Sequence, residues 1–139
     1  MTTGVPESGR KLVCFLEAHG LAHTKHQETL IFGDQVDVWT GGGLAVQIVR
    51  DRQNWFVEVR PEHIPDADWY DVAFLKEQIT RSVGSDVLPF EYQAVYLVEH
   101  WEEIRTLITG PVGSQNISEL NRRRNDRAAR RYPSLLQAN

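Results

Sequence analysis

Cysteine is nearly missing from this chain, which has only Cys14 among its 139 residues and therefore cannot form an intramolecular disulfide. No apolar run approaches the ~20 residues that a membrane-spanning helix needs. No positively charged leader followed by an apolar stretch is present near the start. These absences favour a soluble protein of a reducing cytoplasm, without a membrane partner. The length is that of one domain whose hydrophobic core is large enough for it to fold without disulfide bonds.

Recognised catalytic and cofactor-binding motifs are also missing. The sequence has no G-x-S-x-G elbow, no G-x-x-x-x-G-K-[ST] loop and no paired cysteine ligands. The glycines at 41–43 lack the helix and lysine of a phosphate-binding loop, so a hairpin turn is the better interpretation. His23 and His26 form an H-x-x-H pair, but residues three apart on a strand face opposite sides, and no further ligand completes a zinc site. We therefore predict no catalytic residues, no cofactor and no metal.

What the sequence does contain is a central pair of strands between residues 41 and 60. Apolar and polar residues alternate in 44–49 and again in 55–60, and the residues at 51–54 suit a tight turn between them. Two shorter extended runs, 28–32 and 35–40, precede this hairpin. The short connections predict a four-stranded antiparallel meander.

Helical periodicity flanks the predicted sheet. Residues 6–19 form a first helix that ends at Gly20. Asp68 is placed to cap a second helix over 69–81. A longer helix after Pro89 carries an apolar stripe at alternating spacings of four and three and should lie across the sheet; the stripe is Phe90, Ala94, Leu97, Trp101, Ile104 and Ile108. The predicted class is α+β: an N-terminal helix, a four-stranded antiparallel meander, then two or three C-terminal helices on one face of the sheet.

Charge divides the chain into an acidic body and a basic end. Residues 1–118 carry nine basic and seventeen acidic residues, a net charge of −8, whereas residues 119–139 carry six arginines and two acids, a net charge of +4. We predict a compact domain over 1–109, a linker over 110–115, and a basic helix over 116–139 that docks on the same domain. The arginines are candidates for nucleic-acid binding: Arg122, Arg123, Arg124, Arg127, Arg130 and Arg131.

Acidic residues also cluster on the long helix, at Glu99, Glu102 and Glu103, beside His100. Only pairs three or four residues apart could share a ligand, so a solvent-exposed acidic face is the favoured interpretation. If this face has a function, it suits a basic partner.

The segment from Ile48 to Ile79 resembles a pattern in bacterial polymorphic-toxin immunity proteins and their relatives. The pattern is a strand that ends in R-D-R, a tight turn, an aromatic strand and a helix that starts W-[YF]-D. In this chain its members are Arg50, Asp51, Arg52, Trp55, Phe56, Trp69, Tyr70 and Asp71. The resemblance covers about a quarter of the chain. It implies that the protein neutralises a cognate toxin domain by tight binding in the cytoplasm.

Three functions remain open from the sequence. The first is an immunity-type module that binds a basic toxin domain through Asp66, Asp68, Trp69, Asp71, Glu99, Glu102 and Glu103, with any exposed tryptophan among Trp39, Trp55, Trp69 and Trp101 as an anchor. The second is a nucleic-acid accessory protein that uses the arginine-rich end. The third is a small enzyme or ligand binder with a pocket between the sheet and the long helix.

Overall fold

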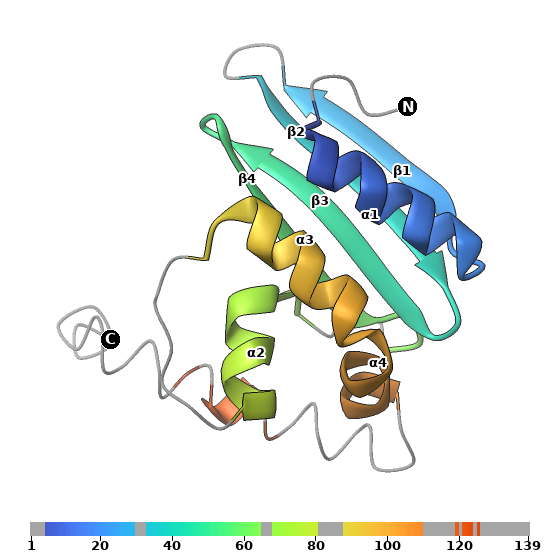
Figure 1. Cartoon of the computed structure of the whole chain (residues 1–139), viewed down its shortest axis with the longest axis vertical. Helices are drawn as coiled ribbons and strands as arrows, with labels where there is room; N and C mark the ends of the chain where they lie inside the picture. The colour runs from blue at the N-terminus through green and yellow to red at the C-terminus, as the bar shows by residue number, and fades with distance from the viewer. Residues whose placement is uncertain are drawn as a thin grey trace, which may run out of the picture.

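The computed structural model of the chain describes residues 5–29, 33–64, 68–80, 88–109, 119, 121–123 and 125. It confirms the α+β class, with one helix before an antiparallel sheet and further helices after it (Figure 1). The elements are α1 (Glu7–Ala18), β1 (Ala22–Thr29), β2 (Asp34–Gly41), β3 (Leu44–Asp51), β4 (Asn54–Pro61), β5 (Tyr70–Asp71), α2 (Val72–Thr80), α3 (Phe90–Glu99) and α4 (Trp101–Thr109). The strands lie in sequence order, each antiparallel to its neighbours.

Two tight turns produce the central meander. Arg52 and Gln53 have φ angles of 51° and 72° between the paired ends of β3 and β4, and Gly42 and Gly43 have φ angles of 62° and 88° between β2 and β3. Two consecutive residues with positive φ match the twist of antiparallel strands. Both turns confirm the hairpins predicted from the sequence.

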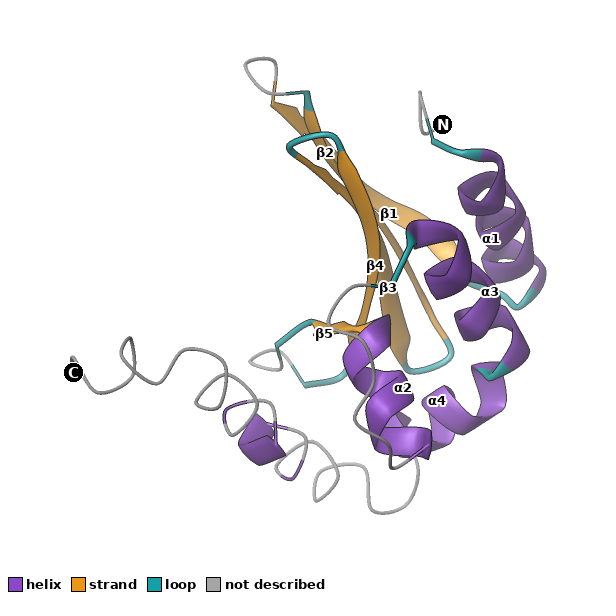
Figure 2. Cartoon of the chain, turned by 60° about the vertical axis from the view of Figure 1, so that its left-hand side comes forward, coloured by secondary structure: helices purple, strands orange, loops and turns teal. Residues whose placement is uncertain are grey.

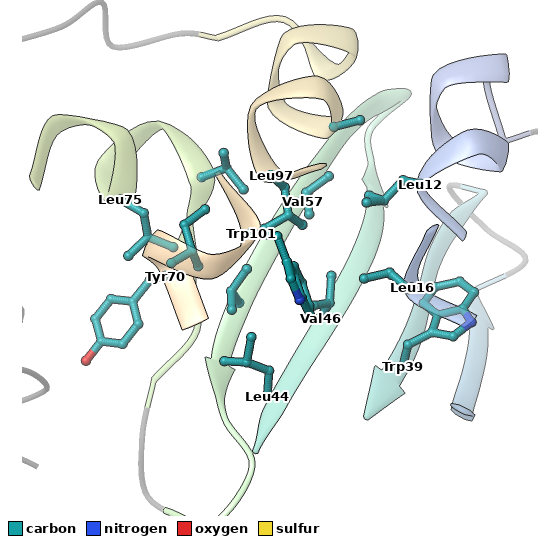
Figure 3. Packing of buried hydrophobic residues seen from close by; sticks show 14 of the residues in the cluster. Leu12, Leu16, Trp39, Leu44, Val46, Val57, Tyr70, Leu75, Leu97 and Trp101 are labelled. Carbon is teal, nitrogen blue, oxygen red and sulfur yellow. The ribbon is translucent and has the colours of Figure 1, made fainter. Parts of the chain in front are cut away.

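The helices cover one face of the sheet, and the main core lies between the two layers (Figure 2). Val46 and Val57 of the sheet meet Leu12, Leu97 and other helix residues there (Figure 3). The apolar stripe predicted for the long helix is confirmed, because Ala94, Leu97, Trp101, Ile104 and Ile108 are all buried. Because alternate residues of a strand face opposite sides, the other set lies on the sheet face away from the helices. It includes Val36, Val38, Val49 and Phe56, of which Val38 and Val49 are buried.

The first strand begins at Ala22, six residues before the run that the sequence predicted. Every residue of β1 is exposed, so this edge strand has no alternation of apolar and polar residues for a sequence pattern to detect. The rest of the predicted run, residues 30–32, lies outside the described residues.

The second helix begins at Val72 rather than Trp69. Tyr70 and Asp71 instead pair with Val59 and Glu58 as β5, a fifth strand that the sequence did not predict. The predicted cap, Asp68, is also wrong, because the Phe74 backbone N–H donates to Asp71 Oδ1 at 2.8 Å. Complete burial of Tyr70 accounts for the difference, since an extended backbone places its ring in the core.

The predicted long helix is divided at His100. This residue has φ −115° and ψ 26°, and α3 ends before it while α4 begins after it. Backbone hydrogen bonds continue across the break, from the His100 N–H to Tyr96 O and from the Ile104 N–H to His100 O. The apolar stripe therefore continues across a change of helix direction.

The predicted linker, 110–115, lies outside the described residues. Within 116–139 the described residues are helical, and two of them contact the body of the protein. Asn121 Oδ1 accepts a hydrogen bond from the Tyr70 hydroxyl, and Arg123 donates to Gln78 Oε1 at 2.8 Å. Across the part of the chain that the structure describes, none of the helices has the length and apolar character needed to span a bilayer.

Candidate protein-binding groove

Helices α1 and α3 lie side by side and run in the same direction (Figure 1). At their N-terminal ends, a Cβ atom on Gly9 would lie 3.1 Å from the Phe90 ring and only 2.2 Å from a Val5 methyl group, so the missing side chain permits the close approach. Near their C-terminal ends, Phe15 of α1 meets Trp101, the first residue of α4, edge to face with ring centroids 5.5 Å apart. The two helices therefore enclose a shallow channel on their outer side.

This channel, which we call the α1–α3 groove, has a volume of about 710 Å³. Its apolar lining comes from both helices: Leu12, Phe15, Phe90, Ala94, Val95 and Val98. A second hollow of about 240 Å³ shares Phe15, Val98 and Glu99 with it and extends toward α4. The third function predicted from the sequence placed a pocket on the inner side of this helix, where core residues such as Leu97 lie; the groove is on the outer side.

Two large apolar side chains of α3 are exposed beside the groove. Val95 is 46 % exposed and Tyr92, one turn earlier, is 63 % exposed. Elsewhere on this helix Ala94 and Leu97 are buried against the core, so α3 carries apolar residues on both its inner and its outer side. Exposed apolar surface with a polar rim is typical of a protein interface.

Carboxylates stand on both sides of this apolar surface. Glu91, Val95 and Glu99 follow one another at intervals of four residues, so they form one line along α3. Among the described residues, neither Glu91 nor Glu99 has an ion-pair partner. Glu99 occupies the last turn of α3 and lies two residues before the start of α4, so the opposite dipoles of the two helix ends both act on its charge.

Glu102 and Glu103 continue the acidic surface at the start of α4, where the dipole favours them. Both have local partners. His100 Nδ1 lies 2.9 Å from Glu103 Oε1, and Arg105 Nε lies 3.5 Å from Glu102 Oε2. The structure therefore brings the predicted residues Glu99, Glu102 and Glu103 together at one end of the groove, with Glu99 as the member that has no such partner among the described residues.

Tyr96 lies beneath this acidic end. Burial, with a further contribution from the charge of Glu103, raises the pKa of its hydroxyl. The hydroxyl oxygen is buried and has no hydrogen-bond partner among the residues that the structure describes, and the ring stacks on His100 with centroids 4.1 Å apart. The Tyr96 side chain is therefore uncharged at neutral pH and contributes packing contacts.

The other predicted contact residues lie away from the groove. Asp71 caps α2, Trp69 is half-buried with the Arg60 guanidinium 4.8 Å from its ring centroid, and Asp68 is exposed in the segment before β5. Asp66 lies outside the described residues. None of the three described residues lines the groove, so the predicted contact set divides into two separate places.

Trp39 and Trp101 are buried in the core, and Trp55 and Trp69 are half-buried with arginines over their rings. The exposed aromatic residue is instead Tyr92, which the sequence analysis did not single out. Its spacing to Val95 and Glu99 places it on the outer side of the helix, and that spacing was the available signal.

Arg122 and Arg123, two of the six candidate nucleic-acid ligands, both pair with Glu119, and their hydrogen bonds lower the pKa of that carboxyl to about 2. Arg123 also contacts Gln78. Arg124, Arg127, Arg130 and Arg131 lie outside the described residues.

A polar cluster that the sequence analysis dismissed lies between β1 and β2. A β-bulge between His23 and Lys25 turns both histidines to the same side, contrary to the expectation that they face apart. The completely buried Asp37 carboxylate contacts His23 Nε2 at 2.9 Å and His26 Nδ1 at 2.6 Å, and accepts from Gln35 Nε2 at 2.9 Å. Within the described ranges no group of three potential ligands is arranged to hold a metal ion. The cluster fastens the exposed edge strand to the sheet.

Comparison of the chain with family models, with curated proteins and with solved structures finds no match.

Proposed function

We propose that this protein is a non-catalytic binding module that holds a basic protein partner against the α1–α3 groove. The observation that carries the proposal is the exposed Val95 side chain between the carboxylates of Glu91 and Glu99 in the groove, with the exposed Tyr92 outside the groove lining. Burial of apolar area supplies affinity, and the surrounding charge supplies orientation and speed of association. The resemblance to immunity proteins supports a toxin domain as the partner class, which would be neutralised inside the cell.

The charge of the groove favours a protein over a nucleic acid. The carboxylates of the groove repel phosphates, whereas they attract a cationic protein cleft such as that of a nuclease. The described arginines at the C-terminal end already share Glu119, which lowers their availability to phosphate.

The direct test is a tagged purification of the full-length chain from lysate of its native host, with and without nuclease treatment. We expect a stoichiometric protein with a basic domain that survives nuclease. A Glu91→Lys/Glu99→Lys double variant is the matched control, and it should retain the fold but recover much less of that partner. Recovery of nucleic acid alone would contradict the proposal and would direct attention to the arginine-rich end.

The toxin assignment has its own test. The recovered partner, expressed alone, should arrest growth, and co-expression of the wild-type chain should restore it. The double variant should restore growth less well at equal expression. A partner that does not affect growth would remove the immunity role and leave a binding module of another kind.

A further inference from the structure

Resting on the function proposed above, we propose that the groove takes one α-helix of the partner, a basic amphipathic helix antiparallel to α1 and α3. The lining explains why the occupant is a helix. Both walls are helices, whose backbone groups are already used in their own hydrogen bonds, so an extended segment would find few backbone partners there. A helix satisfies its own backbone and buries only side chains.

The dimensions of the groove determine the length of the occupant. Helix α3 has 10 residues and α1 has 12, which correspond to about 15 and 18 Å at 1.5 Å per residue. A partner helix of about three turns covers that distance. Its apolar side chains would enter the hollow beside Val95 and Val98, in the manner of an amphipathic helix in a hydrophobic groove.

The line of Glu91, Val95 and Glu99 specifies the pattern of the partner. The two carboxylates are eight residues apart, about 12 Å along the helix axis. A complementary helix has Lys or Arg at two positions seven or eight residues apart, with an apolar residue midway between them. The pattern places one cation at each carboxylate when the apolar residue contacts Val95.

The direction of the occupant follows from the electrostatics of the two ends. Helices α1 and α3 both end near Phe15 and Trp101, and neither has a basic residue in its last turn. The N-terminus of α4 lies at the same end and offsets the C-terminus of α3, so the negative potential there comes from the C-terminus of α1 and from Glu99, Glu102 and Glu103. The positive N-terminus of the partner helix belongs there, which makes it antiparallel to both walls.

Three synthetic 15-residue peptides provide the test, by amide chemical-shift titration of the full-length protein. The first has leucines at helical spacing between lysines and arginines, the second replaces its central leucine with proline, and the third replaces its basic residues with glutamate. We expect the first to shift amides of α1 and α3. The proline and glutamate peptides should bind at least tenfold more weakly, as should the first peptide with a Val95→Asp protein.

A spin label at either end of the first peptide tests its direction. An N-terminal label should broaden the signals of Glu99 and Trp101, and a C-terminal label should broaden those of Ser8 and Glu91. Equal binding of the proline peptide, the reverse pattern of broadening, or shifts confined to Val36, Val49 and Phe56 on the sheet face away from the helices would overturn the inference. Failure of the inference differs from failure of the function. A partner that is lost with the Glu91→Lys/Glu99→Lys and Val95→Asp proteins, together with equal binding of the leucine and proline peptides, would keep the groove as the binding site and remove the helix as its occupant.

Discussion

The inner and outer sides of α1 and α3 are both apolar, but they differ in what covers them. On the inner side, Leu12, Leu16 and Leu97 are completely buried against the sheet. On the outer side, Val95 remains exposed between Glu91 and Glu99, which have no ion-pair partner among the described residues, and Tyr92 is exposed beside it. The inner side thus gains free energy from folding, whereas the outer side can gain it only by binding. Stability and binding should therefore respond to separate substitutions on the same helices.

The largest expected effect is on the inner side. Leu97→Ala removes a completely buried side chain and leaves a cavity, which should lower the free energy of unfolding by about 2 to 5 kcal/mol. Chemical denaturation measures the change. Val95→Ala is the matched control, since it shortens an exposed side chain two residues away on the same helix and should change stability by less than about 0.5 kcal/mol. Equal losses in both variants would contradict the division into two sides.

The second-largest loss of stability is expected from the buried polar cluster around Asp37, between β1 and β2. Asp37→Ala removes the acceptor of Gln35, a buried donor, and of two half-exposed histidines that can turn to water. The expected cost is about 1 to 3 kcal/mol, the usual penalty of a buried donor left unsatisfied. Denaturant unfolding of this variant is compared with that of Asp51→Ala, which removes an exposed carboxylate from the same sheet and should be nearly neutral. A neutral Asp37→Ala would mean that the cluster does not hold β1 in place.

Tyr96 offers a smaller effect with a defined pH dependence. The pKa of the Tyr96 hydroxyl is raised in the folded protein above the ordinary tyrosine value of 10.0. As the pH rises above 10.0, the hydroxyl therefore loses its proton in the unfolded chain before it does so in the folded protein. This tyrosine should therefore lower stability progressively above that pH. Tyr96→Phe should be within about 1 kcal/mol of the wild type at neutral pH, because the removed hydroxyl has no partner, and should lose less stability at alkaline pH. Denaturation at pH 8 and above 10 compares the two proteins, and identical alkaline losses would show that Tyr96 does not contribute.

The smallest change in stability should accompany a large change in binding. Val95→Asp introduces a third carboxylate between Glu91 and Glu99 at an exposed position, and repulsion from these two neighbours at i±4 should lower stability by no more than about 1 kcal/mol. Binding of the captured partner should weaken at least tenfold, because a charge would be desolvated where an apolar contact was made. Calorimetry measures both quantities. Unchanged affinity with an intact fold would remove Val95 from the interface.

Periodic segments were predicted well, and segments without periodicity were not. The central hairpin and the stripe from Ala94 to Ile108 follow from alternation and helical spacing, which burial imposes directly on the sequence. Strand β1 is exposed along its length, so burial imposed no pattern on it. Tyr70 and Asp71 form a strand only through pairing with β4, a contact between distant segments that local pattern does not contain.

The candidate site was predicted only in part, for similar reasons. Glu99, Glu102 and Glu103 were found because their charges are adjacent in the sequence. The apolar half of the groove was missed because Phe15 and Val95 belong to different helices, and only the fold brings those helices together. The histidines at 23 and 26 were judged to face apart, and a bulge brought them together on Asp37.

The most direct test of the central claim is the association rate of the captured partner with the full-length protein, measured by stopped flow at low and high salt. The comparison is with a Glu91→Lys/Glu99→Lys variant that unfolds at the same denaturant concentration as the wild type. We expect fast association of the wild type that slows as salt rises, and slow association of the variant with a flat or reversed salt dependence. Equal rates and equal salt dependence in the two proteins would contradict the claim that this groove receives a basic partner.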